Sequence, residues 1–305
     1  TMLGPARSKQ YVLCIDAMFR TGIGGIMTVR IVTDSGSDIP SEVCSDLGIV
    51  VVPLTVSFGI DSYRDGVDLA SEEFYRRLVE EDVMPTTSQP SVGSFVEAYE
   101  SLQGSADDVL SIHVSSKLSG TLNSATQAAS QVGQQASIQL FDSKQVSMGF
   151  GFSVMAAATV AKRGGTVDEA VAAAQSVLDR TSVYVLFDTL KYLAKGGRMR
   201  NAQALVGTVL QIKPILTLDD GEIITQQKIR TFRKGVQTMG QLVEQCGALE
   251  SAAVLYTTEQ SEAHNFADSL KANLPQGTNP WTIRLSPAIG THGGPGVLGV
   301  VCVSA

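Results

Sequence analysis

Runs of Val, Ile and Leu alternate with helix-like segments through the first half of this chain, and this alternation limits the fold more than any other feature of the sequence. The apolar runs contain few polar residues, as strands buried on both faces of a sheet do. We predict strands at 29–33, 50–58, 109–114 and 138–141, and helices at 71–81, 91–103 and 120–131. Strands that alternate with helices in this way form a parallel sheet covered by helices on both faces.

The second half of the chain has a different pattern. Two strand-like runs flank Asp220-Gly221, and Asp-Gly is a favoured tight turn of β-hairpins. The other elements predicted here are strands at 252–256, 281–285 and 297–303 and helices near 233–246 and 259–274. This mixture of elements predicts an α+β domain in which part of the strand pairing is antiparallel.

We expect the boundary between the two domains near the Gly164-Gly165 pair. Residues 166–169 read Thr-x-x-Glu, a capping box that starts a helix at 167. The predicted fold is therefore α/β with two domains: an N-terminal domain at 27–165 with a parallel sheet, and a C-terminal α+β domain at 166–305 with a mixed or antiparallel sheet. Residues 1–26 show no clean periodicity, so we expect an N-terminal extension or an expression remnant, with native translation starting at Met27.

Composition argues against several classes of partner. The chain has 23 Lys and Arg against 30 Asp and Glu, a net charge of −7, and no long basic cluster, so we expect no nucleic-acid binding. Cys14, Cys44, Cys246 and Cys302 form no C-x-x-C pair, as is typical of reduced thiols in a cytoplasmic protein. The three histidines form no zinc motif, so we expect no metal. The uncharged stretch at 145–161 is too short and too polar to span a bilayer, which predicts a buried helix.

Common enzyme motifs are missing from the sequence. It contains neither a phosphate-binding G-x-x-x-x-G-K-[ST] nor the G-x-S-x-G turn that presents a nucleophilic serine. A G-x-G-x-x-G does occur at 294–299, but it precedes a strand where a dinucleotide site needs it to follow one. We therefore expect no nucleotide cofactor.

Two polar loops are candidate binding elements. The first precedes the helix predicted at 91–103 and carries more polar side chains than an N-cap needs, since Ser91 can serve as the cap. The second opens the helix predicted at 120–131, where free N–H groups and the helix dipole favour an anion. One hydroxyl of this second loop is expected to take the N-cap position. The candidate ligand-binding residues are Thr87, Ser88, Gln89, Ser115, Ser119 and Gly120.

Two further residues stand in glycine-rich segments. Arg198 follows Gly196-Gly197 and could reach an anion without steric crowding, although a basic helix end before a glycine cap is also routine. His292 lies in a glycine loop, where a structural and a binding role are equally compatible with the sequence. The segment at 34–38 could bind a cation or a phosphate, but turn and cap chemistry explains it equally well. We therefore assign it to structure.

Taken together, these segments resemble the DegV family of bacterial fatty-acid-binding proteins. The resemblance runs from residue 28 to 305, and the matching motifs fall in the order of the family. They are Val-Thr-Asp-Ser at 32–35, Thr-Ser-Gln-Pro-Ser at 87–91, Ser-Ser at 115–116 with Leu-Ser-Gly-Thr at 118–121, Phe-Asp-Ser at 141–143, Tyr-Leu at 192–193 with Lys-Gly-Gly-Arg at 195–198, and His-x-Gly-Pro-Gly at 292–296.

The resemblance implies that a long-chain fatty acid of the C14–C18 class lies between two domains, with its chain in an apolar tunnel of the N-terminal domain. It implies that Thr87 and Ser119 hold the carboxylate and that Arg198 and His292 complete the polar network. It also implies a protein that is not an enzyme by itself. Such a protein presents the acid to the catalytic subunit of a fatty acid kinase, which forms acyl phosphate for phospholipid metabolism, in the cytoplasm and with transient contact to a membrane surface.

One alternative from another class remains open at this point. Ser119 as nucleophile, His292 as base and an acidic residue such as Asp34 could form a serine hydrolase acting on acyl esters. The strained turn that such a serine needs is missing around residue 119. The carrier interpretation is therefore the prediction, with the hydrolase as its alternative.

Overall fold

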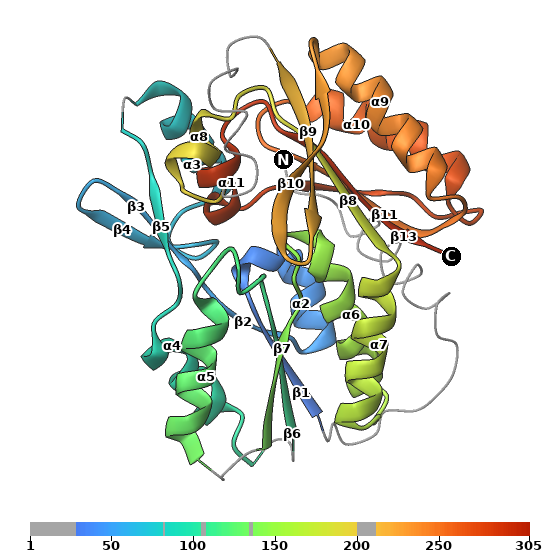
Figure 1. The fold of residues 1–305 in the computed structure, drawn as a ribbon. Helices are drawn as coiled ribbons and strands as arrows, with labels where there is room; N and C mark the ends of the chain where they lie inside the picture. The colour runs from blue at the N-terminus through green and yellow to red at the C-terminus, as the bar shows by residue number, and fades with distance from the viewer. Residues whose placement is uncertain (1–28, 82, 105–107, 134–136, 200–211) are drawn as a thin grey trace.

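The computed structural model describes residues 29–81, 83–104, 108–133, 137–199 and 212–305, and these residues form three sheets (Figure 1). The extension expected at 1–26 lies outside the described residues. The first sheet is parallel throughout, with the strand order β2-β1-β6-β7. Its strands are β1 (Val29–Asp34), β2 (Val50–Val52), β6 (Asp108–His113) and β7 (Ser137–Asp142). The predicted parallel sheet is confirmed.

Helices cover both faces of this sheet. Side chains alternate along β1, so that Ile31 packs in the core beside α6 while Val32 packs in the core beside α4 and α5. On the face of Val32 lie α4 (Val92–Ser101) and α5 (Thr121–Val132). On the face of Ile31 lie α2 (Ser41–Leu47), α6 (Met148–Lys162) and α7 (Val167–Asp179). The 3-10 turn η1 (Ser35–Ser37) precedes α2. Most of α6 is buried, as predicted for 145–161. Among the described helices, none has the length and apolar character needed to span a bilayer.

The helix predicted to start at 167 forms directly after the Gly164-Gly165 pair. The capping box at Thr166 and Glu169 forms, and each side chain bonds the backbone N–H of the other residue. The helix α7 that it starts packs against α6 and β6, and its buried face joins the core of the first sheet. The Gly164-Gly165 pair turns the chain between α6 and α7, and β8 of the second sheet follows α7. The domain boundary predicted near this pair stays a prediction.

The second sheet is mixed, with the strand order β10-β9-β8-β13-β11-β12 and a single parallel pair, β11 with β12. Its strands are β8 (Thr181–Leu186), β9 (Lys213–Asp219), β10 (Glu222–Ile229), β11 (Leu249–Tyr256), β12 (Trp281–Arg284) and β13 (Leu298–Ser304). The helices α9 (Phe232–Gln245) and α10 (Gln260–Leu270), with the 3-10 turn η4 (Lys271–Asn273), cover one face. The other face turns toward the first domain, and its apolar side chains share a core with α6 and α7. The predicted hairpin forms around Asp220-Gly221, and both residues adopt positive φ.

A third, small antiparallel sheet was not predicted. Pro53 has no N–H to donate to a strand ladder, and it divides the strand predicted at 50–58 into β2 and β3, which belong to different sheets. The small sheet consists of β3 (Thr55–Phe58), β4 (Asp61–Arg64) and β5 (Thr86–Ser88), and α3 (Ser71–Glu80) packs beside it. The short helix α11 (Pro287–Gly293) contacts β3, β5, α3 and α8 (Lys191–Lys195). A segment of the first half of the chain is thereby joined to a helix near its end (Figure 1).

Candidate functional site

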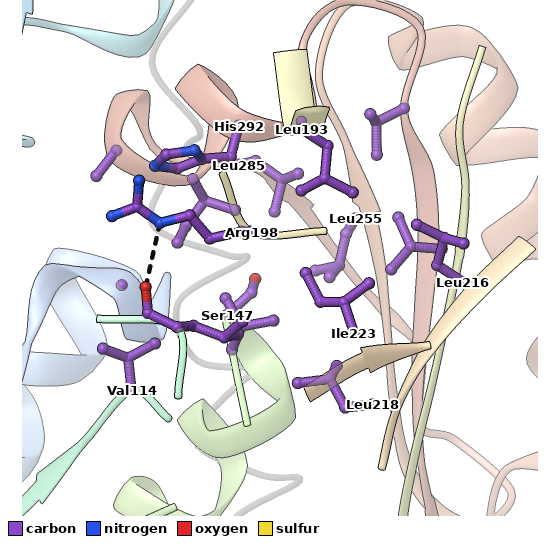
Figure 2. Close-up of a pocket in the computed structure, with 18 of the residues that line it drawn as sticks. Val114, Ser147, Leu193, Arg198, Leu216, Leu218, Ile223, Leu255, Leu285 and His292 are labelled. Atoms are coloured by element: carbon purple, nitrogen blue, oxygen red, sulfur yellow. Dashed lines mark hydrogen bonds between the residues drawn. The ribbon is translucent and has the colours of Figure 1, made fainter. Parts of the chain in front are cut away.

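An apolar cavity of about 120 Å³ lies between the first and second sheets. Gly36 and Val114 line it at the carboxyl ends of β1 and β6, which is the edge of a parallel sheet where ligands bind. Most of its apolar wall comes from the second sheet, as Figure 2 shows for Leu216, Leu218 and Ile223. The aliphatic residues of that wall are Val183, Val185, Leu216, Leu218, Ile223 and Leu255.

The resemblance placed the acyl chain in a tunnel of the N-terminal domain, and that location stays a prediction. The cavity described here has lining residues from both sheets, because one face of the second sheet turns toward the first domain. Alternate residues of β8 and β9 point to this face, which is why Val183 and Val185 line the cavity while Leu186 packs under α9. The cavity therefore belongs to the interface between the domains.

The four residues that the sequence predicted for the polar end all line this cavity: Thr87, Ser119, Arg198 and His292. Thr87 lies on β5 and His292 on α11, and the Thr87 Oγ1 atom is 2.7 Å from Nε2 of His292. Gly196 makes this arrangement possible, because a Cβ atom there would lie 2.2 Å from Nδ1 of His292. Residues 205 positions apart in the sequence thus form one polar group.

Arg198 is held by backbone carbonyl groups. Its Nε donates to the carbonyl of Leu118 at 3.2 Å, the bond drawn as a dashed line in Figure 2. Its Nη1 donates to the carbonyl of Gly196 at 2.5 Å. Burial lowers the pKa of the guanidinium from its ordinary value, but an arginine stays charged in proteins. The positive charge is therefore fixed beside the loop that carries Ser119, and donor groups of the guanidinium remain beyond these two bonds.

His292 is neutral at physiological pH. Burial, and then the charge of Arg198, lower its pKa to about 4. Its Nδ1 atom is buried and has no hydrogen-bond partner among the described residues. A buried N–H without a partner is rarer and costlier than a bare lone pair, so the tautomer that carries its proton on Nε2 is favoured. In this tautomer Nε2 donates to the Thr87 hydroxyl, and the hydroxyl proton of Thr87 is free for another acceptor.

Ser119 precedes α5, and the N-cap position of this helix is taken by Gly120. The expectation that a hydroxyl of this loop takes the N-cap position is therefore wrong. The Ser119 hydroxyl lies 2.8 Å from Oγ1 of Thr121 and accepts from the N–H of Thr121 at 3.3 Å. Its position at the helix N-terminus and on the cavity agrees with the predicted anion-binding loop.

The other four predicted residues are described and lie outside the cavity lining. Ser115 is buried and donates to the carbonyl of Gly221. The side chain of Gln89 donates to the hydroxyl of Ser124 and packs against Gly120. A Cβ atom at Gly120 would lie 2.3 Å from Oε1 of Gln89. Ser88 is exposed on β5. The structure gives Ser115, Gln89 and Gly120 packing roles next to the site.

The position of α11 depends on two carboxylates of the first domain, which the sequence did not indicate. Asp38 accepts from the N–H of Ser286 at 3.0 Å, and Asp65 accepts from the N–H of Ala288 at 3.1 Å. Loss of hydration raises the pKa of Asp38 to about 7 and that of Asp65 to about 6. Both carboxylates lie where a helix N-terminus favours negative charge.

The tip of the β9–β10 hairpin is fastened to the first domain (Figure 1). Asp220 forms ion pairs with Lys117 at 2.7 Å and with Lys144 at 2.6 Å, and these bonds lower its pKa to about 2. Gly221 has φ +81°, and a Cβ atom there would lie 2.5 Å from Oγ of Ser115. The two hairpin strands, β9 and β10, which are joined by this tip, supply part of the apolar wall.

The hydrolase constellation is not assembled. The Nε2 bond of His292 goes to Thr87, and Ser119 bonds Thr121. Asp34 bonds Nδ1 of His113 at 3.0 Å and the N–H groups of Gly36 and Val114, so it does not orient His292. Within the described ranges no three His, Cys, Asp or Glu side chains gather as metal ligands.

Comparisons with known proteins show which family this chain resembles in sequence and in fold. Residues 28–305 match the model of the family described as uncharacterised protein, DegV family. A DegV domain-containing protein of Caldanaerobacter subterraneus is 36% identical over 275 residues, which cover 89% of this chain and 97% of that protein.

Two solved structures share the fold. The fatty-acid-binding DegV family protein from Thermus thermophilus has 31% identity and a TM-score of 0.84, and the match covers 92% of this chain and 100% of that chain. DegV of Bacillus subtilis, described as a fatty acid binding protein, has 34% identity and a TM-score of 0.84, with 91% of this chain and 99% of that chain covered.

The depressed pKa of His292 leads to a test of stability against pH. The unfolded chain binds a proton on this residue near pH ~6.5, whereas the folded chain does so only near pH 4. His292 therefore lowers the free energy of unfolding as the pH falls through this window. The raised pKa values of Asp38 and Asp65 act in the opposite direction over nearly the same range.

In the variant His292→Gln, the amide N–H of glutamine replaces the imidazole N–H as a donor of similar reach, and the glutamine does not titrate. We expect that wild type loses more free energy of unfolding than this variant between about pH 7 and about pH 4.5, in urea titrations at both values. The aspartates contribute equally to both proteins and cancel in the comparison. Equal losses in the two proteins would contradict the assignment of a neutral, buried imidazole.

Proposed function

The chain belongs to the DegV family, and we propose that it binds a long-chain fatty acid of the C14–C18 class in the cavity between its two sheets. The observation that carries the proposal is the composition of this one cavity, in which aliphatic side chains line the wall and Thr87, Ser119, Arg198 and His292 stand together at one end. The two solved structures described above as fatty-acid-binding proteins support the ligand class.

The apolar wall supplies most of the affinity. A chain of 16 carbons that buries ~14 methylenes at ~0.8 kcal/mol each gains on the order of 11 kcal/mol before the entropic losses of binding. The cavity volume of about 120 Å³ is small beside the ~300–1,000 Å³ of typical ligand pockets. The aliphatic walls therefore move apart when the chain enters.

The carboxylate is held by hydroxyl donors and balanced by a fixed cation. A buried carboxylate is costly unless it is hydrogen-bonded or paired. With Nε2 of His292 donating to Thr87, the Thr87 hydroxyl donates to one carboxylate oxygen, and the Ser119 hydroxyl is placed to donate as well. Arg198 provides the opposite charge from its anchored position. His292 acts through Thr87 and is a positioning residue.

The protein presents the bound acid to the catalytic subunit of a fatty acid kinase. Hydroxyl donors leave a carboxylate oxygen with lone pairs available for phosphoryl transfer, whereas a bidentate Arg clamp would occupy both oxygens. The chain itself is the carrier and not the catalyst, and the acyl phosphate formed enters phospholipid metabolism. We place this step in the cytoplasm, with transient contact to a membrane surface for exchange of the acid.

Native mass spectrometry of the freshly purified protein tests ligand binding directly. We expect one bound mass per chain that matches a C14–C18 fatty acid, confirmed by lipid extraction. Thr87→Val should weaken the affinity for palmitate roughly 10- to 100-fold, the effect of one lost hydrogen bond to a charged group. Ser88→Ala, next to it but outside the cavity, should bind as wild type does. Absence of bound lipid together with no uptake of added fatty acid would rule the proposal out.

The ion pairs that hold Asp220 are exposed, and exposed ion pairs contribute little free energy. The β9–β10 hairpin is therefore the part of the cavity wall whose displacement requires the least free energy. Asp220→Asn should speed dissociation of a fluorescent fatty acid about two- to fivefold at low salt, and the difference should shrink at high salt because screening weakens the pairs in wild type. Asp219→Asn, an exposed neighbour on the same hairpin, is the matched control. An unchanged dissociation rate in Asp220→Asn would place the moving wall elsewhere.

The kinase step is tested with the loaded protein, a fatty acid kinase catalytic subunit and ATP. Acyl phosphate is trapped with hydroxylamine and measured as the hydroxamate. We expect Arg198→Met to bind lipid more weakly but still to load at saturating fatty acid, because the apolar wall supplies most of the affinity. The loaded variant should yield much less hydroxamate, because the charge that balances the carboxylate is gone. If the loaded wild-type protein yields none, the carrier role for the kinase is wrong. Ester turnover that is lost in Ser119→Ala would instead favour the hydrolase.

A further inference from the structure

Two cysteines meet on the face of the second sheet that turns away from the cavity. Cys302 lies on β13 and is fully buried, while Cys246 follows α9 as its C-cap and is partly exposed. Side chains alternate along β13, so that Val301 packs toward the first domain and Cys302 packs toward α9 and α10. Cys246 packs against the same apolar cluster. Both residues are free thiols.

Backbone contacts hold the two residues near each other. The hydroxyl of Ser304, two positions after Cys302 on the same strand, donates to the carbonyl of Cys246 at 3.3 Å. One residue further, the N–H of Ala305 donates to the carbonyl of Ala248 at 2.9 Å. The end of α9 is therefore tied to the end of β13 on both sides of a short turn.

The surroundings give the two sulfur atoms different reactivities. As a thiol, Cys246 donates to the carbonyl of Leu242 at 3.5 Å. Its thiolate is favoured first by Cys302 and then by Ser182 and Tyr184, which lower the pKa of Cys246 below its ordinary value. Ser182 lies directly opposite Cys302 in the β8–β13 pair. The hydrogen bond to Cys246 and burial raise the pKa of Cys302 above its ordinary value. A partly exposed cysteine beside a fully buried one is the arrangement of an attacking and a resolving cysteine.

We propose that Cys246 and Cys302 form a hydroperoxide-sensitive dithiol, a modification site separate from the lipid cavity. The Cys246 sulfur attacks one oxygen of the hydroperoxide, the O–O bond breaks, and water or an alcohol leaves. The sulfenic acid formed on Cys246 is attacked by the sulfur of Cys302, the S–O bond breaks, and water leaves with the proton of the Cys302 thiol. The two sulfur atoms are oxidised together by two electrons, and one hydroperoxide is reduced.

The test uses the full chain with Cys14→Ser and Cys44→Ala, which retains only the proposed pair. Cys44 is a suitable residue to remove, because burial raises the pKa of its thiol to about 11 and no other cysteine shares its core cluster among the described residues. After treatment with hydrogen peroxide, we expect peptide mapping to show residues 246 and 302 joined and the chain lighter by two hydrogen atoms. The wild-type protein, which needs no substitution to fold, should show the same joined peptide.

Single variants separate the roles of the two sulfur atoms. Cys302→Ala should leave a sulfenic acid on Cys246 that dimedone labels, and Cys246→Ala should leave Cys302 unlabelled under the same treatment. Direct oxidation of Cys246 to the sulfinic acid in wild type, with no joined peptide, would overturn the proposal. Labelling of Cys302 in Cys246→Ala to the same extent as Cys246 in Cys302→Ala would overturn the assignment of attacking and resolving residues.

Discussion

The capture of α11 by two carboxylates is the contact on which the rest of the site depends. Asp38 and Asp65 belong to the first half of the chain, and they bind backbone N–H groups at the start of a helix from the second half. That helix carries His292 to Thr87 and adds Ala288 to the core of the small sheet. Burying two carboxylates is costly, as their raised pKa values show. The cost is offset by hydrogen bonds that only the correctly docked helix can supply.

Burial also sets the character of the two ends of the cavity. At the polar end it keeps His292 neutral beside a charged Arg198, so among the described residues that line the cavity the fixed charge there is positive. At the other end, the second sheet presents an aliphatic face toward the first domain. An amphiphilic anion is complementary to both ends at once, and the first domain completes the polar end with Thr87 and Ser119.

The features that depend on local pattern could be predicted from the sequence. The alternation of strands and helices predicted the parallel sheet, Asp220-Gly221 predicted the hairpin, and Thr166 with Glu169 predicted the start of α7. The resemblance to the family named Thr87, Ser119, Arg198 and His292, which the fold places on one cavity. Features that depend on contacts between distant segments could not be predicted. Pro53 redirects a strand to another sheet, Ser115 bonds the hairpin, and Asp38 and Asp65 act on a helix more than 200 residues away.

The small sheet has a consequence for how the protein is made. Its strands leave the ribosome early, but Tyr75, on the helix beside it, finds its hydrogen-bond partner 210 residues later, at the carbonyl of Leu285. Contacts of such long sequence separation form late, because the loop between them must close first. The cavity between the two sheets therefore stays incomplete until α11 has been synthesised. The polar end of the cavity forms only once α11, the last of the described helices, has been made and His292 has met Thr87.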